Sequence, residues 1–271
     1  MKEHVNSSPF VQSEFLNLFT RNISSNSVVI NDHLELNGGV VTQLGDRNLI
    51  DYRPTPFISN KDVEKFNISK LQFDSLSYFQ VVEIEKLVNY QSFKVTKSDV
   101  GVFLLLPDNY EDYVNNLSKK KRHELRRKKR IFQDENLDGT LVESSSVESF
   151  KIFIDQHKLS QGEKGEFMNQ EMENYFAQLL SLKGWKLYTL NSSIGVLSSA
   201  FVYESQQGCY LYNSSKNPKF DKLNPGIVLV DLIIQHLITK QIFYFDFLKG
   251  TERYKYDFGG TSHQLYDVEI I

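Results

Sequence analysis

Residues 243–255 read FYFDFLKGTERYK, an aromatic run that ends in charged and polar side chains. Alternate residues of a strand point to opposite faces, so the phenylalanines at 243, 245 and 247 share one face and Asp246 lies on the other. An acid in so apolar a strand needs a hydrogen-bonding partner or a chemical task. We therefore predict a strand over residues 242–248 and take Asp246 as a candidate catalytic group. A purely structural ion pair or loop cap is the alternative.

The segment before this strand has the features of an anion site at the start of a helix. Residues 227–240 carry apolar side chains at helical spacing, and Pro225 and Gly226 precede them. Proline suits the first helical turn because its missing N–H has no helical acceptor there. A helix N-terminus presents unpaired N–H groups and the positive end of the helix dipole, which favours a phosphate. An ordinary helix start is the alternative.

A strongly basic helix is predicted within residues 107–132. Residues 119–130 hold nine Lys or Arg and one Glu, a net charge of +8, whereas the whole chain carries −3. Apolar residues on this helix are sparse and trace one thin stripe. Its remaining surface is either solvated or faces an anion such as a cofactor phosphate, a membrane surface or RNA.

The rest of the chain predicts an α/β protein. In the C-terminal half, helices are expected at 147–159 and 172–182, and strands at 140–143, 185–190, 195–204 and 208–212. In the first half, short helices are expected at 61–66 and 73–78, and strands at 27–30, 40–44, 82–85 and 100–106. A polar, aromatic tail is expected to follow the strand at 242–248 and close the chain.

Composition excludes several classes of protein. With 271 residues, 40% hydrophobic and 13% aromatic, the chain has enough apolar surface for one large or two small cores. Cys209 is its single cysteine, so no intramolecular disulfide can form. The N-terminal residues lack an apolar signal core, and no run approaches the roughly 20 apolar residues of a spanning helix. We expect a cytoplasmic protein without a transmembrane segment.

Four segments resemble, in order, motifs of the CelD/BioF-like branch of the GNAT acyltransferase superfamily, which is related to FemAB proteins. They are LSKKKRHELRRK at 117–128, His157 followed by Lys164-Gly165, FDKLNPG at 220–226 and DFLKGTERYK at 246–255. Asn224 stands where the family usually has Ser, and Lys249 where it usually has Arg. The resemblance covers residues 107–256.

The resemblance implies a GNAT fold of the α/β (α+β) class, with a mixed, mostly antiparallel sheet flanked by helices. Two neighbouring strands of this sheet splay and admit the pantetheine arm of acyl-CoA. FemAB-like relatives carry two GNAT-like halves. By analogy, we expect residues 1–106 to be a reduced N-terminal half and residues 107–271 to be the acyltransferase domain.

The reaction implied is transfer of an acyl group from acetyl-CoA or another acyl-CoA, without a metal, to a small-molecule amine. An amino sugar or a precursor of cell-envelope polysaccharide is the expected acceptor. A carboxylate or His takes the proton of the amine, and a Tyr can protonate the thiolate. The expected catalytic residues are Asp246, Glu252, His157 and Tyr254. The expected CoA-binding residues are Lys222, Asn224, Pro225, Gly226 and Ile227, and the expected acceptor-binding residues are Tyr244, Lys255 and Arg126.

Two alternatives stay open. A FemX-like transferase uses aminoacyl-tRNA, in which case the basic helix meets RNA. A catalytically degenerate GNAT scaffold binds a partner instead, and the absence of a Q/R-x-x-G-x-G pyrophosphate loop from the sequence is compatible with it. Binding of acyl-CoA distinguishes the first reading from both alternatives.

Overall fold

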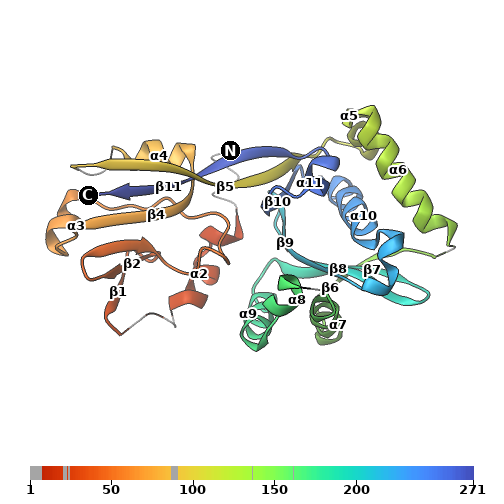
Figure 1. Cartoon of the computed structure of the whole chain (residues 1–271), viewed down its shortest axis with the longest axis horizontal. Helices are drawn as coiled ribbons and strands as arrows, with labels where there is room; N and C mark the ends of the chain where they lie inside the picture. The colour runs from red at the N-terminus through yellow and green to blue at the C-terminus, as the bar shows by residue number, and fades with distance from the viewer. Residues whose placement is uncertain (1–7, 21–22, 24, 87–90, 136, 161) are drawn as a thin grey trace. The chain divides into compact units, whose positions relative to one another are not determined.

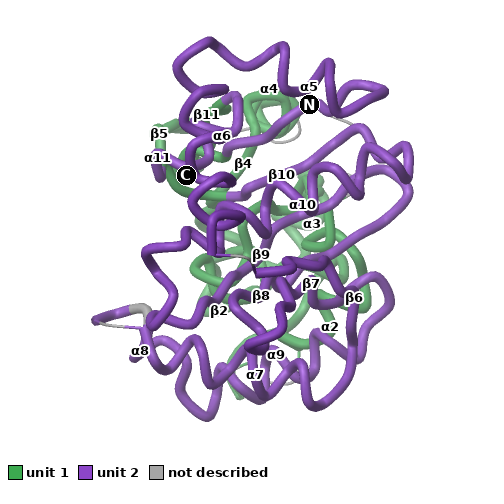
Figure 2. The backbone as a smooth tube through the Cα atoms, turned by 90° about the vertical axis from the view of Figure 1, so that its right-hand side faces the viewer, with its two compact units in different colours: residues 1–101, 249–251, 262–271 green, residues 102–248, 252–261 purple. Residues whose placement is uncertain are grey.

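The computed structural model describes residues 8–20, 23, 25–86, 91–135, 137–160 and 162–271, and it divides the chain into two compact units (Figure 2). Unit 1 holds residues 1–101, 249–251 and 262–271, and unit 2 holds residues 102–248 and 252–261. The end of the chain and a short segment of the 246–255 motif therefore belong with the N-terminal residues.

Unit 1 is a sheet of mixed pairing with short helices. Its strands follow the order β1-β2-β3-β4-β11-β5, in which β3 and β4 are parallel and the pairs β1-β2, β2-β3 and β4-β11 are antiparallel. The strands are β1 (Ser27–Ile30), β2 (Leu34–Asn37), β3 (Val40–Gln43), β4 (Lys70–Ser77), β5 (Phe93–Leu105) and β11 (Thr261–Ile270); the helices are η1 (Pro9–Val11), α2 (Ser13–Thr20), α3 (Asn60–Lys65) and α4 (Tyr78–Ile84).

Two predicted elements of unit 1 are wrong in type. Residues 73–78, predicted as a helix, lie mostly in strand β4, where Leu71 and Phe73 are buried on the same side. Residues 82–85, predicted as a strand, lie largely in helix α4. Ser77 starts that helix with a capping box, because its Oγ accepts from the Gln80 N–H and the Gln80 side chain accepts from the Ser77 N–H.

The predicted polar tail is also wrong, since residues 261–270 form β11. This strand pairs antiparallel with β4, with Ile270 opposite Leu71 and Leu265 opposite Ser77. A β-bulge lies between Tyr266 and Val268, so the buried side chains of the strand do not alternate regularly. The sequence pattern therefore conceals a strand that completes the sheet of unit 1.

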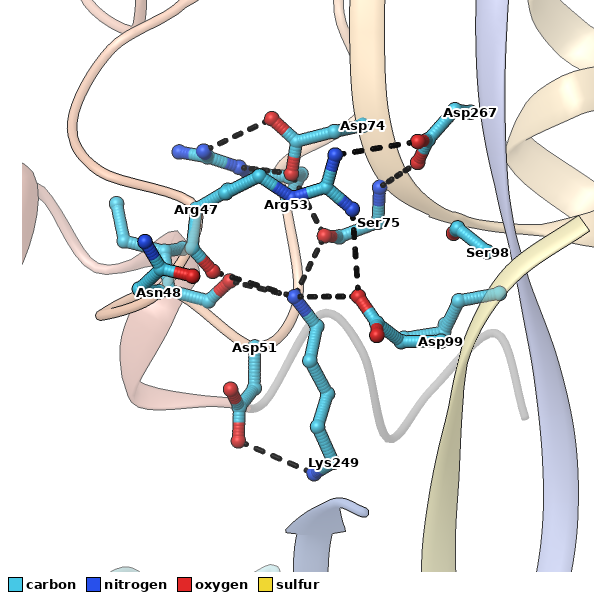
Figure 3. A network of polar contacts seen from close by, with 12 residues as sticks. Arg47, Asn48, Asp51, Arg53, Asp74, Ser75, Ser98, Asp99, Lys249 and Asp267 are labelled. Carbon is cyan, nitrogen blue, oxygen red and sulfur yellow. Dashed lines mark hydrogen bonds and ion pairs between the residues drawn. The ribbon is translucent and has the colours of Figure 1, made fainter. Parts of the chain in front are cut away.

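Lys249 lies at the centre of a polar network in unit 1 (Figure 3). Its Nζ donates to Ser75 Oγ at 2.7 Å and pairs with Asp99 at 3.4 Å. Arg47 in turn pairs with Asp99 at 3.4 Å and with Asp267 at 3.2 Å. One basic residue of the 246–255 motif is thereby held by the side chains of unit 1.

The sheet strands of unit 2 follow the order β10-β9-β8-β7-β6 (Figure 1). The pairs β6-β7, β7-β8 and β8-β9 are antiparallel, and β9-β10 is parallel. Its strands are β6 (Thr140–Ser144), β7 (Trp185–Ser192), β8 (Gly195–Glu204), β9 (Cys209–Lys216) and β10 (Tyr244–Lys249); its helices are α5 (Tyr110–Asn116), α6 (Lys119–Asp134), α7 (Val147–Lys158), α8 (Glu163–Phe167), α9 (Gln170–Leu180), η2 (Pro218–Leu223), α10 (Pro225–Thr239) and α11 (Arg253–Asp257).

Helices cover both faces of this sheet. α7 and α9 pack on one face, and α10, which also contacts α6, packs on the other (Figure 1). The buried face of α10 includes Val230, Ile233, Ile234 and Leu237. The expected mixed, mostly antiparallel sheet flanked by helices is confirmed, including the strand predicted at 242–248.

The basic segment forms two helices and not one. α5 ends at Asn116 and α6 begins at Lys119, because Ser118 has an extended backbone and its Oγ accepts from the Lys121 N–H. Within the described ranges, no helix is long and apolar enough to cross a membrane. The same ranges contain no group of three or more His, Cys, Asp or Glu side chains that could hold a metal ion.

Candidate active site

Strands β9 and β10 pair over only a short distance in unit 2. Phe245 lies opposite Cys209 and Asp246 opposite Tyr210, and in the described part of the chain these are the two residue pairs that join β9 to β10. Both strands continue, β9 to Lys216 and β10 to Lys249. The two parallel strands therefore separate toward their carboxyl ends, as the resemblance implied.

A cavity of about 260 Å³ lies beside β9 and the start of α10. Its walls combine apolar side chains with serine hydroxyls. It is lined by Ser199, Ala200, Leu211, Ser214, Ser215, Lys216, Asp221, Asn224, Pro225, Gly226, Ile227, Leu229, Val230 and Tyr254. This lining suits an elongated ligand that has both methylene and amide groups.

The N-terminus of α10 closes one end of the cavity. Asn224 adopts a left-handed conformation with φ 53°, which Asn tolerates better than most residues. Pro225 occupies the first helical turn. No heavy atom lies within 4 Å of the point where a Cβ on Gly226 would stand, so this glycine leaves open space. Ile227 lines the cavity, whereas Lys222 is exposed on η2 and is not part of the lining.

A glutamine from the opposite face of the sheet orients two cavity serines. Gln156 of α7 is buried, and its Oε1 accepts from the hydroxyls of Ser199 and Ser215, each at 3.3 Å. Its Nε2 donates to the Val196 carbonyl at 2.8 Å. The sequence analysis missed this group, because Gln156, Ser199 and Ser215 lie far apart in the sequence.

Asp246 is fully buried and holds the end of β10. Its carboxylate accepts from the Tyr244 hydroxyl and the Leu248 N–H, each at 2.7 Å. Leu248 has a positive φ of 62°, a strained conformation that this N–H bond helps to fix. Burial and the Asp246 charge both raise the pKa of Tyr244. Asp246, Tyr244 and Glu252 are all absent from the residues that line the cavity.

Lys255 and Glu252 form an ion pair next to the end of β10. The Lys255 side chain is buried, donates to the Leu248 carbonyl at 3.4 Å and pairs with Glu252 at 2.9 Å. The Glu252 side chain is 58% exposed, so its carboxylate is reachable from solvent. Burial, together with the Glu252 charge, raises the pKa of Tyr254, whose side chain lines the cavity. Of the four predicted catalytic residues, Glu252 is exposed and Tyr254 is half-buried, whereas Asp246 and His157 are buried.

His157 lies apart from these groups, on α7. It is buried, and its Nε2 is 2.9 Å from Asn213 Oδ1 on β9. It does not line the cavity. Arg126 is exposed on α6, where it lines a separate groove. The structure thus brings five of the predicted residues to the cavity: Asn224, Pro225, Gly226, Ile227 and Tyr254.

Comparison with known proteins identifies the family of unit 2. The model of the Acetyltransferase (GNAT) domain matches residues 119–256, just over half of the chain. A search of curated protein sequences finds no match. The family match spans the cavity, the splayed strands and the basic helix.

Several solved structures have a similar fold. A conserved protein of unknown function from Bacteroides thetaiotaomicron VPI-5482 has a TM-score of 0.60 at 12% identity, covering 98% of this chain and 92% of its own. FemX has a TM-score of 0.59 at 12% identity, with coverages of 98% and 95%. The C-terminal domain (DUF2156) of an Agrobacterium fabrum protein described as a lysylphosphatidylglycerol synthetase gives 0.57 at 12% identity, with coverages of 95% and 90%. At such low identity these similarities concern the fold alone.

Proposed function

The chain belongs to the GNAT acetyltransferase family, and on this premise we propose that it is an N-acyltransferase that moves an acyl group from acyl-CoA to an amine. The observation that carries the proposal is the cavity between the splayed part of β9 and the N-terminus of α10. Acetyl-CoA is the simplest donor. An amino sugar or another precursor of the cell envelope is the proposed acceptor.

The cavity residues fit the donor. The helix N-terminus at Gly226 offers backbone N–H groups and open space for a pyrophosphate, and Lys219 and Lys222 of η2 are exposed nearby in the sequence. Leu211 and Val230 supply apolar wall for the pantetheine arm, whereas the hydroxyls of Ser199 and Ser215 donate to Gln156 of α7 and hold β8 and β9 together beside the cavity. Acyl-CoA supplies the thioester carbonyl that the amine attacks.

Glu252 and Tyr254 of the 246–255 motif carry out the two proton transfers of the reaction. We assign removal of the amine proton to the Glu252 carboxylate, which is exposed, pairs with Lys255 and lies two residues before the cavity residue Tyr254. Tyr254 keeps its proton at neutral pH because its pKa is raised, so its hydroxyl can donate to the departing thiolate. A register shift in the β8-β9 pairing makes Tyr212 an extra residue of β9. We assign polarisation of the thioester carbonyl to a backbone N–H of this strand.

The other predicted residues take supporting roles in this proposal. Asp246 and Lys255 fix the turn that carries Glu252, and His157 positions β9 through Asn213. Unit 1 is proposed to descend from the first of two GNAT-like halves.

Gly226→Leu tests the donor site directly. The added side chain meets no protein atom within 4 Å at its Cβ and extends into the space proposed for CoA. We expect the variant to keep the wild-type melting temperature or to exceed it, since Leu favours a helix over Gly by roughly 0.5–1 kcal/mol. Binding of acetyl-CoA, measured by isothermal titration calorimetry, should weaken by at least about tenfold.

Gly226→Ala serves as the graded control, with a smaller loss of affinity. Equal acetyl-CoA affinity in the wild type and the Leu variant would place the donor elsewhere. Absence of acetyl-CoA binding to the wild-type chain would remove the acyltransferase proposal.

A second function is favoured by one observation, the exposed basic face of α6. A transferase that takes its acyl group from aminoacyl-tRNA would use such a face for the phosphates of RNA. Tight binding of tRNA, with a salt dependence of several units that disappears when Lys120 and Arg126 are replaced by Gln, would favour it over the CoA-dependent reaction.

A further inference from the structure

The two halves of helix α6 differ in how their charges are compensated. In the second half, Arg127 and Lys128 are compensated because they pair with Glu124, and Lys129 is compensated because it pairs with the buried Asp231. In the first half, no ion pair joins Lys119, Lys120, Lys121 or Arg126 to an acid among the described residues. Four like charges within about two helical turns repel one another, so an anion bound there would relieve the repulsion.

These uncompensated charges line an open groove. The groove has a volume of about 1110 Å³ and is lined by Ser118, Lys119, Lys120, Lys121, Arg122, His123, Glu124, Arg126, Arg253 and Asp257. Arg253 and Asp257 come from α11, so cations of two separate helices face the same space. The Arg253 side chain is 84% exposed and lies 3.9 Å from Asp257, a distance that leaves its guanidinium able to bind a ligand.

Helix α11 separates this groove from the cavity. Arg253 lines the groove, and the next residue, Tyr254, lines the cavity. Their Cα atoms are consecutive and so about 3.8 Å apart. Glu252, the proposed base, immediately precedes Arg253. A ligand whose anionic group lies in the groove can therefore place an amine at Glu252.

We propose that the groove between α6 and α11 binds a phosphate or diphosphate of the acceptor, so that the substrate is a phosphorylated amine such as an amino sugar phosphate or a nucleotide-linked amino sugar. This inference rests on the proposed function, since it assigns the acceptor of that reaction. Arg253 supplies the planar fork that matches phosphate oxygens, and Lys119 and Lys120 supply point charges.

The size and composition of the groove argue against two macromolecular partners. The uncompensated stretch from Lys119 to Arg126 is about 12 Å long at 1.5 Å per residue, which suits a diphosphate better than a nucleic-acid backbone. No described Phe, Tyr or Trp lines the groove to stack bases. No large apolar side chain of α6 is exposed, whereas a helix that lies on a membrane needs an apolar face.

The test is a titration of the full chain with inorganic pyrophosphate at low salt, after saturation with CoA. Saturating CoA occupies the proposed donor site at the N-terminus of α10, so the heat released on adding pyrophosphate reports binding in the groove. We expect wild-type protein to bind pyrophosphate, and Lys120→Gln/Arg253→Gln to bind it about tenfold more weakly or less. The charge-matched control Arg130→Gln/Lys151→Gln replaces exposed cations outside the groove and should change the affinity by less than about twofold.

Three results would overturn the inference: no binding of pyrophosphate to the CoA-saturated protein, equal losses of affinity in both double variants, or displacement of pyrophosphate by a mixed-sequence single-stranded RNA that binds more tightly. The last result would identify the groove as an RNA surface. If CoA itself does not bind, the proposed function fails, and the comparison of the two double variants still decides whether the anion site exists.

Discussion

At the scale of single residues, the two carboxylates of the 246–255 motif have opposite surroundings. Asp246 is fully buried and both of its described hydrogen bonds go to neighbours within two residues, whereas the Glu252 side chain is 58% exposed. A general base must reach the proton that it removes. Only Glu252 meets that condition, although strand alternation alone made Asp246 the first candidate.

Replacement of the two carboxylates by their amides should therefore separate catalysis from folding. Glu252→Gln should lower turnover by roughly 10²–10⁴ while sparing acetyl-CoA affinity, because only the proton acceptor is lost. Asp246→Asn should lower the free energy of unfolding by about 1–3 kcal/mol, because the amide nitrogen cannot accept the bonds that the carboxylate accepts.

Steady-state rates and urea denaturation of both variants are the measurements. If Glu252→Gln retains wild-type turnover, the base has been misplaced. If Asp246→Asn keeps full stability and loses turnover, the buried carboxylate takes part in the chemistry after all.

At the scale of elements, the strand–helix–strand unit from β9 to β10 could be predicted from the sequence. The apolar spacing over residues 227–240 and the Pro225-Gly226 start are local signals, and a short crossover between parallel strands places the two strands side by side. The pairing of Phe245 with Cys209 confirms that arrangement.

Other elements could not be predicted because their signals are not local. In β11, the bulge before Val268 breaks the alternation that marks a strand. In α4, the Ser77–Gln80 capping box overrides the strand-like alternation of residues 82–85. The site shows the same limit, since Gln156 and its serines come from three separate elements and acquire a shared role only in the folded chain.

The placement of the basic helix depends on a buried carboxylate of α10. Asp231 is fully buried, pairs with Lys129 of α6 and accepts from the Tyr110 hydroxyl of α5 at 2.6 Å and from Gln235 at 2.8 Å. Burial and the Asp231 charge raise the pKa of Tyr110, so this phenol remains a donor. One acid therefore joins three helices.

Asp231→Asn should lower the free energy of unfolding by about 2–3 kcal/mol, because Lys129 is left partly buried without its counter-charge. The double variant Asp231→Asn/Lys129→Gln should regain part of that loss, as a double-mutant cycle in urea would show. Lys128→Gln, which removes a weaker contact on the same helix, should cost no more than about 0.5 kcal/mol. A cycle without coupling between Asp231 and Lys129 would contradict this account.

At the scale of the whole molecule, each unit holds a carboxylate whose pKa is lowered by its partners. In unit 1, burial raises the pKa of Asp74, but the charge of Arg53 and the hydrogen bonds from Arg53 and Ser75 more than offset that effect, so the net pKa is lowered. In unit 2, burial likewise raises the pKa of Glu204, and hydrogen bonds from Lys240 and Tyr188 more than offset that effect. In both units the folded state therefore favours the ionised carboxylate.

The sign of the resulting pH dependence follows from these lowered pKa values. A carboxylate with a lower pKa in the folded state stabilises the fold at every pH above its unfolded value, about 3.9 for Asp and 4.3 for Glu. That stabilisation is lost as the pH falls through the folded pKa, with a slope of up to about 1.4 kcal/mol per pH unit for each proton taken up. Both units should thus lose stability on acidification below about pH 4 to 5.

Urea unfolding at a series of pH values can follow the two units separately. Trp185, the single tryptophan, is buried in β7 and reports unit 2 by its fluorescence, and hydrogen exchange of the β4 amides reports unit 1. Glu204→Gln should flatten the acid dependence of the Trp185 signal and leave that of β4 unchanged, because the lost proton-binding group belongs to unit 2. Asp74→Asn should flatten the acid dependence of the β4 amides and leave that of the Trp185 signal unchanged.

A flat acid dependence in the wild-type chain would mean that these ion pairs form to the same extent in the unfolded state. Equal flattening of both probes by either variant would mean that the two units unfold as one cooperative body.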